Sequence, residues 1–269
     1  MWTQAVVATV SSSARDGDLQ PSVCRGRRGL AREGARVFLA NRTKAKADAV
    51  AADILAAGGQ AESAELDALD EAAVDAHADA VAAAAGGIDV SFTAVSHGDV
   101  HGLPLLELPF EDFARPVATA LRAQFLTTRA AARHMARRGA GVIMTITATT
   151  ARLSIPLVGG TGVAFDAIES QCRQWACELG GHGVRVVWLQ TTGLPEAIAG
   201  SDVLQPGYGT GSAAMTRDEL IAWNQGKAML GRLTTLAEVG RAAAFLASDH
   251  AAAMTAAGLN LTCGQAPGR

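Results

Sequence analysis

The chain alternates between short apolar runs and longer segments in which apolar residues recur at helical spacing. The clearest alternation lies between residues 141 and 193. Residues 142–146 form an apolar, mostly β-branched run, which predicts a buried strand. Residues 163–179 repeat apolar side chains with the period of a helix, and residues 185–189 form a second apolar run. A strand, a long helix and a second strand predict a right-handed crossover between parallel strands.

The same alternation continues on both sides of this unit. It predicts a doubly wound α/β sheet of about seven parallel strands with helices on both faces. We find no internal repeat and no second domain, so residues 1–269 are expected to form one unit. The other expected strands are residues 5–10, 35–40, 88–92 and 258–262 with a third strand ending near residue 65, and the other expected helices are residues 44–57, 70–85, 110–139, 216–228 and 236–247.

The ends of the strands indicate where a functional site should lie. In an open parallel sheet, ligands bind beyond the carboxyl ends of the strands. In the unit described above, these ends are residues 147–150 and 191–193. We therefore expect any active site there.

Composition and charge restrict the class of protein. The chain has 269 residues, of which 49% are hydrophobic, and a net charge of −3. A sizeable core is expected, and binding to nucleic acid or to a membrane surface is not expected. The apolar runs are too short to span a bilayer and no signal peptide is visible, so we expect a cytoplasmic protein with reduced cysteines. The cysteines have no metal-ligand spacing, and Cys172 and Cys177 are expected to fill the core.

Several short motifs follow one another along the chain. They are residues 88–90 (IDV), 104–107 (PLLE), 125–131 (FLTTRAA), 178–186 (ELGGHGVRV), 230–233 (LGRL) and 244–249 (AFLASD). In sequence, order and spacing they resemble motifs of the short-chain dehydrogenase/reductase family. The resemblance implies a Rossmann-type fold, an NAD(P)(H)-dependent oxidoreductase, a segment at residues 194–228 that covers a small-molecule substrate, and a homodimer or homotetramer.

The chain departs from the family at the positions that carry its chemistry. Family members are similar in an Asn that anchors a proton-relay water, a Ser that orients the carbonyl, a Tyr that acts as acid/base, and a Lys that lowers the pKa of the Tyr and holds the ribose. The matching motifs place Ala120, Ala148, Thr161 and Phe165 at these four positions. A threonine hydroxyl does not ionise near neutral pH, and Phe165 supplies no cation. The usual mechanism is therefore expected to be absent or impaired.

Other side chains are candidates for the lost groups. Thr147 and Thr149 flank Ala148, and either hydroxyl is a candidate to replace the serine. His97 lies in a polar loop, at residues 96–101, that has a second histidine and an aspartate. Tyr208 is the single tyrosine of the chain and falls in the substrate-covering segment, where a packed aromatic is the alternative interpretation. Three functions stay open: an oxidoreductase, a non-redox enzyme that reuses the crevice, and a catalytically silent paralogue that oligomerises or binds a metabolite.

The resemblance also implies contacts to a nicotinamide cofactor. In the phosphate-binding turn at residues 16–23, Gly17 is kept, but Pro21 and Val23 replace the other two glycines. Residues 8–29 are either a remodelled loop, with the first strand at residues 5–10, or an out-of-frame segment. Asn41 and Arg42 favour NADP, because a guanidinium matches a 2′-phosphate, although Arg42 also suits a helix cap. Cofactor binding is expected to be weak or absent, and the other expected contact residues are Asp67 and Ala68 after the third strand and Thr192 and Gly193 after the sixth.

Two long helices are expected to mediate self-association. Family members resemble one another in packing these helices, here residues 110–138 and 163–179, against copies of themselves. The second helix carries apolar residues on more than one face. One apolar stripe covers the sheet, and the surplus is expected to contact another copy.

Overall fold

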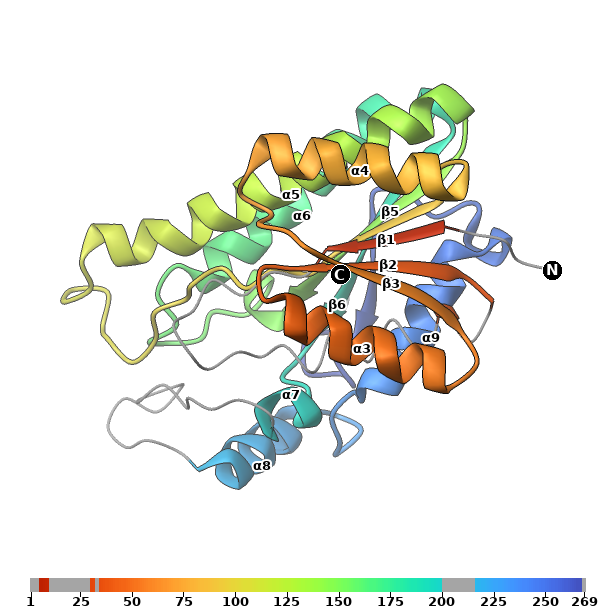
Figure 1. Cartoon of the computed structure of the whole chain (residues 1–269). Coiled ribbons are helices and arrows are strands. Elements are labelled where there is room, and N and C mark those ends of the chain that lie inside the picture. Colours follow the sequence, from red (N-terminus) through yellow and green to blue (C-terminus); the bar gives the residue numbers. More distant parts are fainter. Residues whose placement is uncertain (1–4, 10–29, 32–33, 200–215, 268–269) are drawn as a thin grey trace.

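A parallel sheet of seven strands forms the centre of the computed structural model (Figure 1). The structure describes residues 5–9, 30–31, 34–199 and 216–267. The strand order is β3-β2-β1-β4-β5-β6-β7, and every neighbouring pair is parallel. The strands are β1 (Ala5–Thr9), β2 (Arg36–Asn41), β3 (Gln60–Glu65), β4 (Val90–Thr93), β5 (Gly141–Ala148), β6 (Val184–Thr191) and β7 (Ala257–Leu261).

Helices cover both faces of the sheet (Figure 1). Helices α4, α5 and α6 share one hydrophobic cluster with the sheet, and α3 and α9 share the other. No described helix is long and apolar enough to cross a membrane. The helices are α3 (Lys44–Ala56), α4 (Glu71–Ala85), α5 (Phe110–Arg138), α6 (Thr161–Leu179), α7 (Pro195–Ala199), α8 (Arg217–Lys227) and α9 (Leu236–Ala247).

Strand β5 shows why the sequence has continuous apolar runs. Successive side chains of a strand point to opposite faces of the sheet. Ile143 therefore belongs to the cluster under α4, α5 and α6, whereas Val142 and Met144 belong to the cluster under α3 and α9. Because both faces are covered, the strand needs apolar residues at consecutive positions.

The expected elements agree with the structure within about two residues at most ends. The expected first strand is present as β1. The fourth strand begins at Val90 and not at residue 88. One expectation on the core was wrong: Cys172 is buried, but Cys177 is exposed. Residues five apart on a helix are rotated by about 140° from one another, so the two side chains cannot share one buried stripe.

Helix α6 begins where the chain passes closely against the start of α5. A Cβ added at Gly160, the residue before α6, would clash with the carbonyl oxygen of Phe113. A residue without a side chain is therefore required for this approach. The contact fixes the first turn of α6 against α5.

A buried carboxylate ties α6 to the sheet. Glu169 of α6 is fully buried, and its Oε1 accepts hydrogen bonds from Thr147 of β5 at 3.1 Å and from Gln190 of β6 at 3.3 Å. Its Oε2 accepts from Arg152 at 2.6 Å, in the turn after β5. A buried charge is costly unless it is paired and hydrogen-bonded, and this network meets both conditions. It therefore holds together the ends of the two central strands.

We expect Arg152→Met to lower the free energy of unfolding by about 3 kcal/mol, because the buried carboxylate then keeps only neutral partners. Glu169→Gln should cost less, since the amide keeps the volume and leaves the arginine, whose side chain is 43% exposed, free to reach water. Urea unfolding followed by circular dichroism measures both changes. Arg133→Met, in an exposed ion pair with Asp75, is the control and should cost less than about 1 kcal/mol. If Arg152→Met and the control lowered the free energy of unfolding equally, the pairing of Arg152 with Glu169 would not stabilise the fold.

Candidate functional site

The candidate site lies at the carboxyl ends of the central strands. Strand β4 ends at Thr93 and β5 ends at Ala148, and the chain between residues 94 and 109 crosses this end of the sheet. Helix α6 begins at Thr161, so its positive end faces the same region. This is the place where the sequence predicted a site.

The structure describes the four residues that the motifs align with the family's catalytic positions. Ala120 is buried within α5, and Ala148 is half-buried as the last residue of β5. Thr161 is the first residue of α6, and Phe165 follows one turn later on the same side of the helix. None of the four side chains ionises.

The position of the expected cation is occupied by an aromatic contact. The ring of Phe165 meets the ring of His97 edge to face, with 5.2 Å between the centroids. The three lysines of the chain are Lys44 and Lys46 on α3 and Lys227 on α8. No lysine stands on α6 or in residues 94–109 to replace the missing one.

The two threonines beside Ala148 are both buried. The Thr147 hydroxyl donates to Glu169, so its hydrogen is used in the network below the site. Thr149 opens a short 3₁₀ turn, and its carbonyl oxygen accepts from the amides of Arg152 and Leu153. No observation assigns either hydroxyl to a ligand, and the expectation that one replaces the serine stays a prediction.

The polar loop contributes two buried or half-buried imidazoles. Burial lowers the pKa of His97, and the charge of Asp99 opposes this effect. Burial likewise lowers the pKa of His101, again opposed by Asp99. Both rings are therefore neutral at pH 7. No group of three or more metal-ligating side chains occurs among the described residues.

A hydrogen bond links this loop to α6. Nε2 of His101 lies 2.9 Å from Oγ1 of Thr161, although the residues are 60 positions apart in the chain. The sequence pointed to the loop through the spacing of its two histidines. It gave no signal that His101 meets the residue at the tyrosine position.

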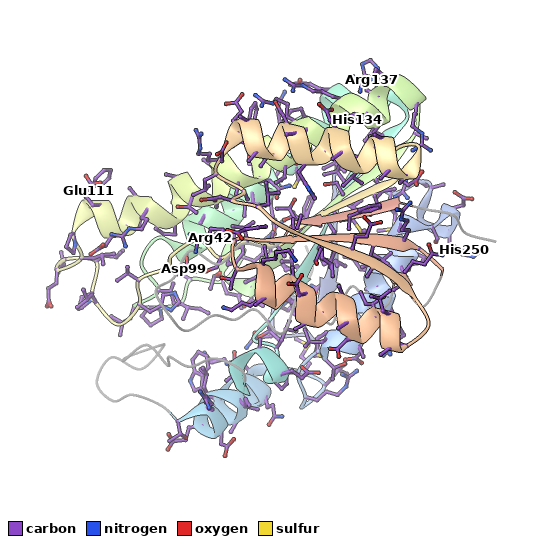
Figure 2. All side chains as sticks on the ribbon, viewed as in Figure 1. Arg42, Asp99, Glu111, His134, Arg137 and His250 are labelled. Atoms are coloured by element: carbon purple, nitrogen blue, oxygen red, sulfur yellow. The ribbon has the colours of Figure 1, made fainter. Side chains whose placement is uncertain are left out.

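Three of the residues expected to contact a nucleotide lie at or just after the ends of β2 and β3. Asn41, the last residue of β2, is buried and accepts a hydrogen bond from the Thr43 amide at 2.8 Å, so its side chain shapes the turn into α3. Arg42 is partly exposed, and Figure 2 shows it at the same end of the sheet as Asp99. Asp67 is exposed and accepts from the Leu69 amide at 2.9 Å. Arg42 and Asp67 thus fit contacts to a nucleotide.

The other residues that we expect to contact a cofactor are less accessible. Ala68 is fully buried after β3. The hydroxyl of Thr192 contacts Gln265, and a Cβ at Gly193 would lie 3.1 Å from the Ile198 side chain. Gly17, Pro21, Val23 and Tyr208 lie outside the described residues. The roles given to these residues stay predictions.

Comparison with known proteins finds relatives and similar structures that match this chain over most of its length. A curated protein named inactive 2-(S)-hydroxypropyl-CoM dehydrogenase 2, from Xanthobacter autotrophicus, is 30% identical over 234 residues, which cover 85% of this chain and 94% of that protein. The structure of NAD+-bound xylitol dehydrogenase is similar with a TM-score of 0.79 at 20% identity, covering 96% of this chain and 98% of that one. A gluconate 5-dehydrogenase from Burkholderia cenocepacia, in complex with NADP and tartrate, gives a TM-score of 0.76 at 23% identity and covers 96% and 94%.

A family model agrees with these relatives. The model described as enoyl-(acyl carrier protein) reductase matches residues 27–265, which is most of the chain. Together with the motifs and the parallel sheet, this match shows that the chain belongs to the short-chain dehydrogenase/reductase superfamily.

Proposed function

We propose that this chain descends from NAD(P)(H)-dependent oxidoreductases and reduces carbonyl compounds by the usual Ser-Tyr-Lys route poorly or not at all. The observation that carries the proposal is the pair of substitutions on the first turns of α6. At the tyrosine position, the Thr161 hydroxyl is bound to His101. At the lysine position, the Phe165 ring contacts His97.

The physical argument concerns the proton that carbonyl reduction requires. An effective acid/base has a pKa near the working pH and contributes about 10²- to 10⁴-fold to the rate. A threonine hydroxyl does not titrate in that range. The methyl side chains of Ala120 and Ala148 donate no hydrogen bond to a carbonyl or a water. All four usual contributions are therefore lost together.

We further propose that a nicotinamide cofactor, if bound, is NADP(H) and is held weakly. The partly exposed guanidinium of Arg42 suits the 2′-phosphate, which it would bind as a charged fork. In contrast, Pro21 lacks an amide donor and Val23 adds a Cβ at the pyrophosphate turn. Phe165 also cannot hold the ribose as a lysine would. One similar structure is bound to NAD+ and another to NADP, so the comparison does not indicate which cofactor this chain prefers.

A second candidate, a silent paralogue that acts by self-association, is supported by the outer face of α5 and α6. Phe125 and Val163 are 43% and 48% exposed on this face, and Phe110 at the start of α5 is 73% exposed. A depression of about 450 Å³ lies beside Phe125, between α4, α5 and α6. We propose that a second copy of the chain covers this face and gives a dimer or tetramer, because a two-fold contact is self-complementary and closes.

NADPH should bind more tightly than NADH, and both should bind weakly. Arg42→Ala should weaken NADPH about tenfold, the equivalent of about 1.4 kcal/mol, and leave NADH unchanged. Isothermal titration calorimetry measures both affinities, and Arg133→Ala on α5 is the matched control. Tight binding of NADH without a response to NADPH would contradict both parts of this prediction.

Reduction of ketones by the wild-type protein with NADPH should be undetectable. The combined variant Ala148→Ser, Thr161→Tyr, Phe165→Lys should recover some turnover, since it restores the carbonyl donor, the phenol and the cation together. Ala148→Ser alone should recover none, which makes it the control. The proposal fails if the wild type turns over ketones robustly and this activity survives mutation of His97, Thr149 and Tyr208.

The protein should be a dimer or tetramer at micromolar concentration by light scattering, and not a monomer of 27.5 kDa. Phe125→Glu should shift the mass towards the monomer, because it places a charge in the apolar contact. Phe245→Glu is the matched control: this phenylalanine is 41% exposed on α9, on the opposite side of the sheet. A monomeric wild type, or equal effects of the two variants, would rule out this face as the interface.

A further inference from the structure

The contact between His101 and Thr161 has the form of a base bound to a nucleophile. An imidazole nitrogen lies 2.9 Å from the hydroxyl oxygen, which is within reach for proton transfer. The hydroxyl belongs to the first residue of a helix, and the imidazole comes from the loop that crosses the same end of the sheet. This contact involves neither a tyrosine nor a lysine, on which the usual mechanism depends.

The surroundings of His101 favour the neutral, basic form of the ring. The half-buried imidazole has a lowered pKa, so Nε2 can accept a proton at pH 7 in the tautomer that carries hydrogen on Nδ1. Asp99, two residues away in the same loop, acts on the ring electrostatically and stabilises positive charge on it. A carboxylate in this role favours the imidazolium that forms after the hydroxyl proton is taken.

Hydrogen-bond donors are available next to the hydroxyl. At the start of α6, the amides of Thr161 and Ala164 donate to Val158 and Gly160. The amides of Gly162 and Val163 have no acceptor among the described residues, as is usual for a first turn.

A buried side chain near this turn also lacks a partner. Oγ1 of Thr150 is buried and has no hydrogen-bond partner in the described part of the chain. The residue lies close to Gly162: a Cβ added to this glycine would lie 3.8 Å from the Cβ of Thr150. A nucleophile followed by a free helix amide is also the arrangement that stabilises an oxyanion in hydrolases of a different fold.

We infer that Thr161 and His101, with Asp99 as the positioning residue, form a site that hydrolyses short-chain esters or thioesters without a nicotinamide cofactor. The Thr161 hydroxyl attacks the carbonyl carbon while its proton passes to Nε2 of His101, and the oxyanion accepts hydrogen bonds from the Gly162 and Val163 amides. The bond to the leaving group then breaks, and the imidazolium returns the proton to the departing alkoxide or thiolate. A water molecule gives a proton to His101 and attacks the acyl-threonine; the bond to the threonine oxygen then breaks, the carboxylic acid is released, and the imidazolium returns the proton to that oxygen.

The size of the acyl group follows from burial. Thr161 is only 6% exposed. Phe165 lies one turn further along α6, and its ring contacts the ring of His97 from the polar loop. A hydroxyl this buried favours a small acyl group such as acetyl over a long or branched chain. We therefore expect the substrates to be short, activated acyl compounds.

The test uses the full chain, free of nicotinamide, with p-nitrophenyl acetate and with an acetyl thioester of cysteamine. We expect turnover of both, and mass spectrometry of the protein quenched during turnover should find the acetyl group on Thr161. Thr161→Val, which keeps the shape of the side chain, and His101→Ala should each lower kcat/KM about 100-fold. Thr161→Ser should keep the activity. Asp99→Asn should lower kcat with KM unchanged, and Asp99→Glu should restore part of it.

Matched controls stand elsewhere on the surface. Thr43→Val and His182→Ala alter exposed residues outside the site and should leave the rates unchanged. Circular dichroism checks that each variant is folded. Wild-type rates no higher than those of Thr161→Val, or acetyl groups found on other residues and not on Thr161, would overturn the inference. Because no cofactor takes part, this outcome is independent of the tests for NADPH binding and ketone reduction.

Discussion

The constraint on which this structure depends is that its sheet is covered on both faces. Strands β5 and β6 place their large apolar side chains in one of two hydrophobic clusters, so a buried polar group on them must find its partners inside the protein. Gln190 does so through the carboxylate of Glu169. Chemistry that involves a ligand is therefore left to the turns and helix starts beyond the strand ends.

Phe165, which the motifs align with the family's lysine, illustrates this separation between packing and chemistry. A phenylalanine at this position is partly buried, packs against the cluster under α4, α5 and α6, and meets the His97 ring. An ammonium in the same place would need a charged or polar partner, because desolvation of an unpaired charge is costly. The aromatic residue has no such requirement and packs against the His97 ring instead.

The sequence predicted the fold well because the periods of its apolar residues are produced by the two covered faces of the sheet. It also indicated where a site is expected, since parallel strands bring their carboxyl ends to one edge. It failed where geometry depends on tertiary contacts. The loop motif of two histidines and an aspartate indicated polarity, but the partner of His101 is 60 residues away, and nothing in the sequence indicated that Thr161 would meet it. Cys177 was misplaced because apolar character alone does not say which side of a helix faces the core.

The close approach of Gly160 to Phe113 makes the two long helices mechanically dependent on each other. Gly160 directly precedes Thr161, and Phe113 lies in the first turn of α5, next to the exposed Phe110. With no side chain between the two backbones, a shift of one helix start moves the other. If a ligand binds in the crevice and a second copy covers the α5 face, as proposed above, the two equilibria are thermodynamically linked, and by reciprocity each changes the free energy of the other to the same extent. The glycine would then be the coupling point between binding and assembly.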